Sequence, residues 1–177
     1  MVHSVELLFD AAGDAAVRAV WDELAEAGIR SLAAHPSPTN RPHVTVTVTR
    51  HLHDGVDEAL TAVLDRLPLD CVIGAPLLFG AGPVTTLARL VVPSAQLMAL
   101  HADVHRVSLP HMTEAPLPHA DPGQWTPHVT LARRVRPEQL ATAVGVSGVT
   151  RSIGATVVGL RHWDGDAKVV HPIGVSS

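Results

Sequence analysis

One tetrapeptide occurs twice in this chain, and each copy carries an imidazole and a hydroxyl. Residues 42–45 read PHVT and open the run PHVTVTVT, and residues 127–130 repeat PHVT and open the run PHVTLARR. Side chains alternate between the two faces of a β-strand, so each run, as a strand, places its His and Thr on one face. The opposite face carries valine or leucine, which can pack into a core. The repeat therefore predicts two half-buried strands that display the same polar pair.

Two such histidines can carry out acid–base catalysis. A neutral imidazole with a pKa near ~6.5 can take or give a proton near pH 7, so two facing rings can do both at once. One of His43 and His128 would act as general base on a water or hydroxyl, and the other would protonate the leaving oxygen. Displacement at phosphorus suits this pair, because one oxygen arrives as another departs on the opposite side. The hydroxyls of Thr45 and Thr130 could donate hydrogen bonds to the non-bridging phosphate oxygens, and no metal is required.

The elements that must position these residues follow one order in each half of the chain. Apolar residues at helical spacing indicate the helices, and short β-prone runs between turn signals indicate the strands. In the first half, we expect a strand at 5–9 and then a helix at 14–27, which Asp14 caps and Gly28 ends. A loop at 31–41 leads to the PHVT strand, and a helix at 56–67 and a strand at 69–79 follow it. After a turn at 80–83, the second half predicts a strand at 85–92, a helix that Ser94 caps, a loop at 109–125, the PHVT strand, a helix at 137–144, and strands at 152–160 and 168–173.

This internal repeat predicts the architecture. We expect a single α+β domain over residues 1–177, built from two intertwined lobes whose repeat halves are about 1–80 and 84–177. The lobes would be related by a pseudo-two-fold axis, with two antiparallel-rich sheets and flanking helices around a central cleft. Both His/Thr faces would line that cleft.

Two H-x-T motifs half a chain apart, on a duplicated α+β pattern, resemble the 2H phosphoesterase superfamily. Within it, the similarity is greatest to the 2′-5′ RNA ligase and RNA 2′,3′-cyclic phosphodiesterase group. The second motif, HVTLAR, matches the family form H-x-T-L-x-R, whereas the first has Val46 where leucine is common. The resemblance implies a bilobal fold, a substrate with a 2′,3′-cyclic phosphate or 2′-5′ phosphodiester, and the roles of acid–base pair for His43 and His128 and of phosphate ligands for Thr45 and Thr130.

Four other residues are candidate substrate contacts. The family pattern favours Arg133, but simple alternation puts it opposite His128 and puts Arg134 on the histidine face; a bulge could reconcile the two. Arg41 lies two residues before His43 and could contact a phosphate. Trp125 could stack on a base, and because aromatic residues make up only 3% of the chain, a mononucleotide or short RNA end suits it better than long RNA.

The remaining histidines offer a rival metal site. His101 and His105 are four apart on an expected helix, and HLH at 51–53 adds two more, but no HExxH motif or carboxylate partner is evident. We therefore interpret His101 and His105 as border residues of an apolar stripe and expect no cofactor. His111 and His119 lie in the loop at 109–125, either lining the cleft or on the surface.

Thr47 and Thr49 are expected to be solvated strand residues opposite a core face that includes Val48.

Composition restricts the class of protein. Apolar residues make up 46% of the 177 residues, which excludes a disordered chain, and a net charge of −4 without charge blocks argues against a long nucleic-acid surface. Cys71 is the single cysteine, the N-terminus does not resemble a signal peptide, and no apolar run approaches the ~20 residues of a membrane span. We expect a cytoplasmic monomer without membrane association.

The leading hypothesis is a metal-independent phosphodiesterase that hydrolyses a 2′,3′-cyclic phosphate or a related cyclic nucleotide or 2′-5′ linkage. The alternative is a catalytically inactive module of the same fold that binds nucleotides or RNA ends, and a histidine-bound metal hydrolase ranks third. The loops at 31–41 and 109–125 would select the natural substrate, and their shape is not readable from sequence.

Overall fold

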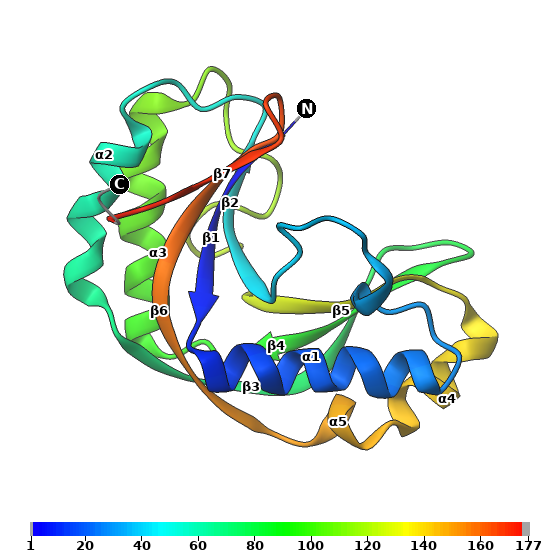
Figure 1. The fold of residues 1–177 in the computed structure, drawn as a ribbon. Helices are drawn as coiled ribbons and strands as arrows, with labels where there is room; N and C mark the ends of the chain where they lie inside the picture. Colours follow the sequence, from blue (N-terminus) through cyan, green and yellow to red (C-terminus); the bar gives the residue numbers. More distant parts are fainter. Residues whose placement is uncertain (1, 175–177) are drawn as a thin grey trace.

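The computed structural model describes residues 2–174, and its strands join in one seven-stranded antiparallel sheet with helices packed against it (Figure 1). The strands are β1 (His3–Phe9), β2 (His43–Thr49), β3 (Leu69–Phe79), β4 (Thr85–Val91), β5 (His128–Val135), β6 (Ile153–Asp164) and β7 (Val169–Pro172). The α-helices are α1 (Ala11–Glu26), α2 (Val56–Leu60), α3 (Ala95–Ser108), α4 (Leu140–Gly145) and α5 (Ser147–Thr150). The 3₁₀ turns are η1 (Leu32–Ala34), η2 (Thr61–Arg66), η3 (Leu109–His111) and η4 (Pro137–Gln139). The predicted α+β fold class is confirmed.

The long strand β6 joins the two ends of the sheet. Its residues 157–163 pair with β1, and its residues 153–157 pair with β3, which gives the order β2-β1-β6-β3-β4-β5, with β7 beside β6. The two sheets expected from the repeat are therefore the two ends of one continuous sheet. The PHVT strands β2 and β5 are the terminal strands of this order, yet they contact each other, because the sheet curves round between them (Figure 1).

Two helices reach across to the other half of the sheet. α1, from the first half, contacts β5, and α3, from the second half, contacts β2; α2 lies beside α3 (Figure 1). Val44 and Val46 of β2 and Val129 and Leu131 of β5 are buried, as their strand positions predict.

Helix ends differ in detail from the predictions. Asp10, and not Asp14, caps α1, because its carboxylate accepts a hydrogen bond from the Gly13 amide at 3.1 Å. Gly28 follows this helix with a φ of 79°, and the Ser94 hydroxyl caps α3 by accepting from the Leu97 amide at 3.2 Å. The helix predicted at 56–67 is α-helical for one turn only and continues as η2.

A β-bulge follows each H-x-T motif. On β2, Thr45 pairs with Glu6 and Thr47 with Val5, so Val46 is an extra residue; on β5, Thr130 pairs with Ala88 and Ala132 with Leu87, so Leu131 is extra. An extra residue reverses the alternation of the side chains that follow it; on β5 a second register shift lies before Val135, which is buried again.

This reversal corrects one prediction. Thr47 and Thr49, expected in solvent, are buried at 1% and 0% exposure, and Val48, expected in the core, is half-buried and faces the cleft described below.

Cys71 lies buried in β3 as a free thiol. Burial, followed by the charges of Asp10 and Asp70, raises the pKa of the thiol to about 11, so it stays protonated near neutral pH. No helix within residues 2–174 combines the length and the apolarity needed to cross a bilayer.

Candidate active site

The two motif histidines are held in the same way. Nδ1 of His43 lies 2.7 Å from the carbonyl oxygen of Arg41, and Nδ1 of His128 lies 2.7 Å from that of Thr126. A carbonyl oxygen only accepts hydrogen bonds, so Nδ1 carries the hydrogen in both rings. In the neutral form, each ring then keeps its lone pair on Nε2, which is the nitrogen that can exchange a proton with a substrate.

Two adjoining cavities form the cleft beside these rings. His128 lines an apolar cavity of about 510 Å³, whose walls include Val48, Phe79 and Trp125. His43 lines a polar cavity of about 370 Å³. Thr45 and Val48 belong to the walls of both cavities, so the histidine faces of β2 and β5 meet at one cleft.

The motif threonines have matched backbone contacts. Trp125 donates its indole N–H to the Thr45 carbonyl at 2.9 Å, and Trp21 of α1 donates its own to the Thr130 carbonyl at 3.1 Å. These carbonyls precede the bulged residues, where regular pairing is interrupted. Thr45 lines both cavities, whereas Thr130 is half-buried on the His128 face and is not part of either wall.

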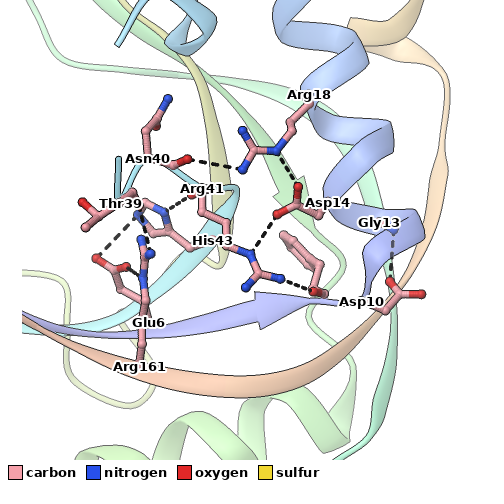
Figure 2. Close-up of polar contacts among 11 residues, drawn as sticks. Glu6, Asp10, Gly13, Asp14, Arg18, Thr39, Asn40, Arg41, His43 and Arg161 are labelled. Carbon is pink, nitrogen blue, oxygen red and sulfur yellow. Dashed lines mark hydrogen bonds and ion pairs between the residues drawn. The ribbon is translucent and has the colours of Figure 1, made fainter. Parts of the chain in front are cut away.

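A buried ion pair lies beside His43. The Arg161 guanidinium donates to the Glu6 carboxylate at 2.7 Å, and both side chains are at most 10% exposed. Nε2 of His43 lies 3.7 Å from the same carboxylate (Figure 2). Ser4 also donates its hydroxyl to Glu6 at 2.8 Å, which fixes the carboxylate against the ring. His43 therefore has a negative group within reach of its proton-exchanging nitrogen.

His128 has an apolar neighbour instead. The Phe79 ring lies 4.5 Å from the His128 ring, centroid to centroid. Burial lowers the pKa of His128 below its usual value, the hydrogen bond to the Thr126 carbonyl opposes this, and the positive charge of His43 lowers it further. The two histidines are thus electrostatically coupled and sit in different surroundings, which favours a neutral His128 at pH 7.

Arg41 is turned toward α1. Its guanidinium donates to the Asp14 carboxylate at 2.9 Å and to the Phe9 carbonyl at 3.2 Å, and Asp14 also accepts from Arg18 (Figure 2). The side chain that sequence reasoning offered as a phosphate contact is therefore engaged in an ion pair. Arg41 nevertheless lines the polar cavity with His43, and its carbonyl oxygen orients the His43 ring.

The bulge decides the placement of the neighbouring arginines. After Leu131, the strand alternation is reversed, so Arg133 lines the polar cavity together with His43 and Thr45. The expectation from simple alternation, that Arg134 occupies the histidine face, is therefore wrong. Arg134 has a φ of 60° and lines a third cavity, the arginine pocket, whose walls also include Arg30, Arg133 and Arg136.

The loop aromatics are fixed by packing. Trp125 stacks on His101 with ring centroids 4.1 Å apart and planes 5° apart, so one face of the indole is covered. His101 Nε2 lies 3.0 Å from the Ala120 carbonyl, and both His101 and His105 are buried, in keeping with a packing role. His119 lines the apolar cavity, whereas His111 packs near Gly55, away from the cleft.

Sequence reasoning missed Glu6, Arg161 and Phe79. Glu6 carried a signal, because it is the one charge in an otherwise apolar strand run, but its position beside His43 depends on the β1–β2 register. The described residues include one group of three possible metal ligands, His3, His51 and Asp166; it contains neither motif histidine and is considered below.

Comparisons with known proteins give the family and the fold of this chain. Residues 12–168 match the sequence profile of the 2′-5′ RNA ligase superfamily. Kluyveromyces marxianus Usb1 has a similar fold at 10% identity, with a TM-score of 0.54 over 97% of this chain and 98% of that one. Its structure with uridine monophosphate gives 0.52 at 12% identity over the same shares. E. coli LigT complexed with NADP+ gives 0.50 at 10% identity, over 98% and 94%. No curated protein sequence matched significantly.

Proposed function

Because this chain belongs to the 2′-5′ RNA ligase superfamily, a member of the 2H phosphoesterases, we propose that it hydrolyses 2′,3′-cyclic phosphates or a related cyclic nucleotide or 2′-5′ phosphodiester. His43 and His128 are the acid–base pair of the proposal. The observation that carries it is the identical Nδ1 hydrogen bond of the two rings, 2.7 Å in each case, on strands whose histidine faces meet at one cleft.

The surroundings of the rings support a division of the two roles. His128, whose pKa is lowered by burial, is the neutral general base that takes a proton on Nε2. His43 is the general acid, because the Glu6 carboxylate at 3.7 Å can pair with its imidazolium form.

The reaction then needs one displacement at phosphorus. A water oxygen forms a bond to phosphorus as it gives a proton to His128, and one ribose oxygen leaves as it accepts the proton of His43. The Thr45 and Thr130 hydroxyls and the Arg133 guanidinium stabilise the charge on the non-bridging oxygens. Proton return between the two rings restores the starting state.

The apolar cavity suits the base of a nucleotide. Its volume of about 510 Å³ lies within the usual ~300–1,000 Å³ of small-molecule sites, and its walls are mainly aliphatic and aromatic. The similar folds of Usb1 and LigT were solved with uridine monophosphate and NADP+, both nucleotides. The substrate in our proposal is therefore a nucleotide or short RNA end that places its base against Phe79 and Val48.

Turnover of 2′,3′-cyclic nucleotides in excess chelator tests the proposal. His43→Ala and His128→Ala should each lose about 10²–10⁴-fold in kcat while keeping the wild-type circular dichroism spectrum. The double variant should lose little more than either single one, since the two groups act together. His111→Ala, outside the cleft, is the control. Near-full activity in either single variant would refute the acid–base assignment, and binding without turnover by the wild type would favour the inactive-module alternative.

The arginine pocket favours a substrate longer than one nucleotide. It measures about 670 Å³ and shares Leu32, His35 and Arg133 with the polar cavity, so phosphates upstream of a cyclic end can reach it. Arg30→Ala and Arg134→Ala should therefore raise KM for a trinucleotide with a cyclic phosphate end, by about tenfold or more for one lost charged hydrogen bond, and leave KM for a cyclic mononucleotide unchanged. An equal rise in KM for both substrates would contradict a role of the arginine pocket in binding upstream phosphates.

A further inference from the structure

A second cluster of chemically competent side chains lies at the other end of β2 from His43. His3 begins β1, His51 follows β2, and Asp166 lies in the turn between β6 and β7; one ligand atom of each falls within 4.8 Å of the other two. His3 pairs with Thr49 at the end of β2. At about 3.3 Å per residue along the strand, the cluster is roughly 20 Å from His43, so it is separate from the cleft.

The distances in the cluster match the edges of a metal coordination shell. Nε2 of His3 lies 3.3 Å from the Asp166 carboxylate, and Nδ1 of His51 lies 3.5 Å from the same oxygen. Charge-assisted hydrogen bonds are shorter, at about 2.7–2.9 Å. Two ligands of a tetrahedral zinc ion, each bound at about 2.0–2.1 Å, lie about 3.3–3.4 Å apart. The spacing is that of two ligands of one metal ion, and it also allows the hydrogen bond between His3 and Asp166 that a bound cation would replace.

The partners of His3 point its lone pair into the cluster. Nδ1 of His162 lies 2.9 Å from the Asp57 carboxylate, which can only accept, so this nitrogen carries hydrogen and Nε2 of neutral His162 accepts. Nδ1 of His3, 3.0 Å from that Nε2, must then be the donor.

The remaining nitrogen of neutral His3 faces two carboxylates. His3 is 1% exposed, and its Nε2 is directed at Asp166 and at Asp164, whose oxygen is 3.4 Å away. A lone pair would repel the carboxylate oxygens, so this contact needs either a proton on Nε2, which gives the hydrogen bond to Asp166, or a metal cation in its place. The relay from Asp57 through His162 is also the kind of outer-shell support that orients histidine ligands of metals.

We propose that Nε2 of His3, Nδ1 of His51 and the Asp166 carboxylate bind a Zn²⁺ ion, with water or Asp164 in the fourth position. Two imidazoles and a carboxylate are a ligand set that zinc prefers and that Ca²⁺ and Mg²⁺ do not. The ion would join the start of β1, the end of β2 and the β6–β7 turn, three segments far apart in the sequence, and would stabilise the fold by its binding free energy.

Zinc titration of the untagged, chelator-treated chain tests this proposal, with calorimetry for stoichiometry and thermal unfolding for stability. We expect one Zn²⁺ per chain and a higher Tm on binding. Even outer-shell partners of a metal are worth about 10–100-fold in affinity, so His51→Ala and Asp166→Asn should weaken binding at least about tenfold. His51 is 45% exposed, so its replacement should leave the apo fold intact.

His53→Ala is the matched control. His53 is two residues from His51 and its ring lies 5.2 Å from that of His51, but its Nε2 contacts the Thr113 hydroxyl at 3.2 Å. Zinc affinity and Tm shift should match the wild type in this variant. Absence of stoichiometric binding, equal affinity in the wild type and His51→Ala, or equal losses in His53→Ala and His51→Ala would each overturn the proposal.

Discussion

The two motif histidines are alike in their backbone contacts and unlike in their neighbours. Both donate Nδ1–H to the carbonyl two residues earlier, which the repeated PHVT sequence makes possible in both strands. A carboxylate lies beside one ring and a phenyl ring beside the other. Two copies of one motif therefore give two histidines in different surroundings. A reaction that needs one acid and one base requires such a difference.

Replacing Phe79 should move the acidic limb of the pH–rate profile. The base must be neutral, and burial lowers the pKa of His128, so kcat/KM for a cyclic nucleotide should fall only as the pH drops through a value below ~6.5. In Phe79→Ala, water reaches the ring, the pKa rises toward its usual value, and the limb moves to higher pH. Phe79→Leu, which keeps an apolar neighbour, should move it less. A limb that stays in place or moves to lower pH in Phe79→Ala would exclude His128 as the base.

At the scale of single residues, the sequence predicted the two motif histidines but not the neighbouring side chains that make their surroundings different. A motif that occurs twice at matched positions is informative in itself, whereas Glu6 and Phe79 reach the histidines only through strand register and sheet curvature. The same holds for His3, His51 and Asp166, which the chain separates widely and the β1–β2 and β6–β7 pairings bring together. The placement of Arg133 depended on one extra residue in β5.

At the scale of elements, the bulge in each motif strand determines which side chains face the cleft. A tryptophan side chain holds each bulge in place through a hydrogen bond. Trp125 comes from the loop after α3 and Trp21 from α1, and each donates to the carbonyl of a motif threonine. Each half of the repeat thus places an indole on one motif strand, Trp21 on β5 of the other half and Trp125 on β2 of the other half.

Loss of either indole N–H should impair activity more than stability. In Trp125→Phe, the Thr45 carbonyl loses its donor, which should lower the free energy of unfolding by about 1 kcal/mol. Small displacements of catalytic groups are costly, so kcat should fall by about tenfold or more. Trp21→Phe should behave alike through Thr130. Urea unfolding and cyclic-nucleotide turnover measure both effects, and unchanged kcat in both variants would mean that the indoles only fill space.

Arg89 of β4 should matter for stability alone. Its guanidinium is fully buried and donates to four carbonyls, of Ile73, Gly74, Gly148 and Arg151, which tie α5 to the sheet. Arg89→Met leaves these acceptors unpaired, so we expect a loss of about 3 kcal/mol or more in urea unfolding. Arg106→Met, on the exposed surface of α3, should stay within about 0.5 kcal/mol. Similar values for the two variants would contradict this role.

The spacing of apolar residues predicted the long helices and strands. It did not show where a side chain competes with the helix backbone for hydrogen bonds. The apolar stripe at 56–67 predicted one helix, but the Thr61 hydroxyl donates to the Glu58 carbonyl at 2.6 Å, where the chain changes from α2 to η2. The four-residue α5 has too short a pattern to be seen in the sequence. The strands at 69–79 and 85–92 matched β3 and β4 closely, because both are bounded by turn signals.

At the scale of the whole molecule, the two halves of the repeat exchange elements. β3 of the first half pairs with β4 of the second, and β6 of the second pairs with β1 of the first. In the same way, α1 of the first half contacts β5 and β6 of the second half, and α3 of the second half contacts β2 and β3 of the first. The buried apolar residues of both halves form one core cluster, and we therefore propose that the two halves make a single domain.

This exchange predicts a single cooperative unfolding transition. Trp21 belongs to the first half but packs against β5, so tryptophan fluorescence should report the loss of both halves at once and coincide with far-UV circular dichroism in urea. Fragments 1–80 and 84–177 should each fail to fold alone, since each exposes the strand edges and apolar faces that the other covers. Two separate transitions, or a folded fragment, would show that the lobes are independent. The cleft would then depend on docking of two domains, and the meeting of His43 and His128 would require an interface, not a shared sheet.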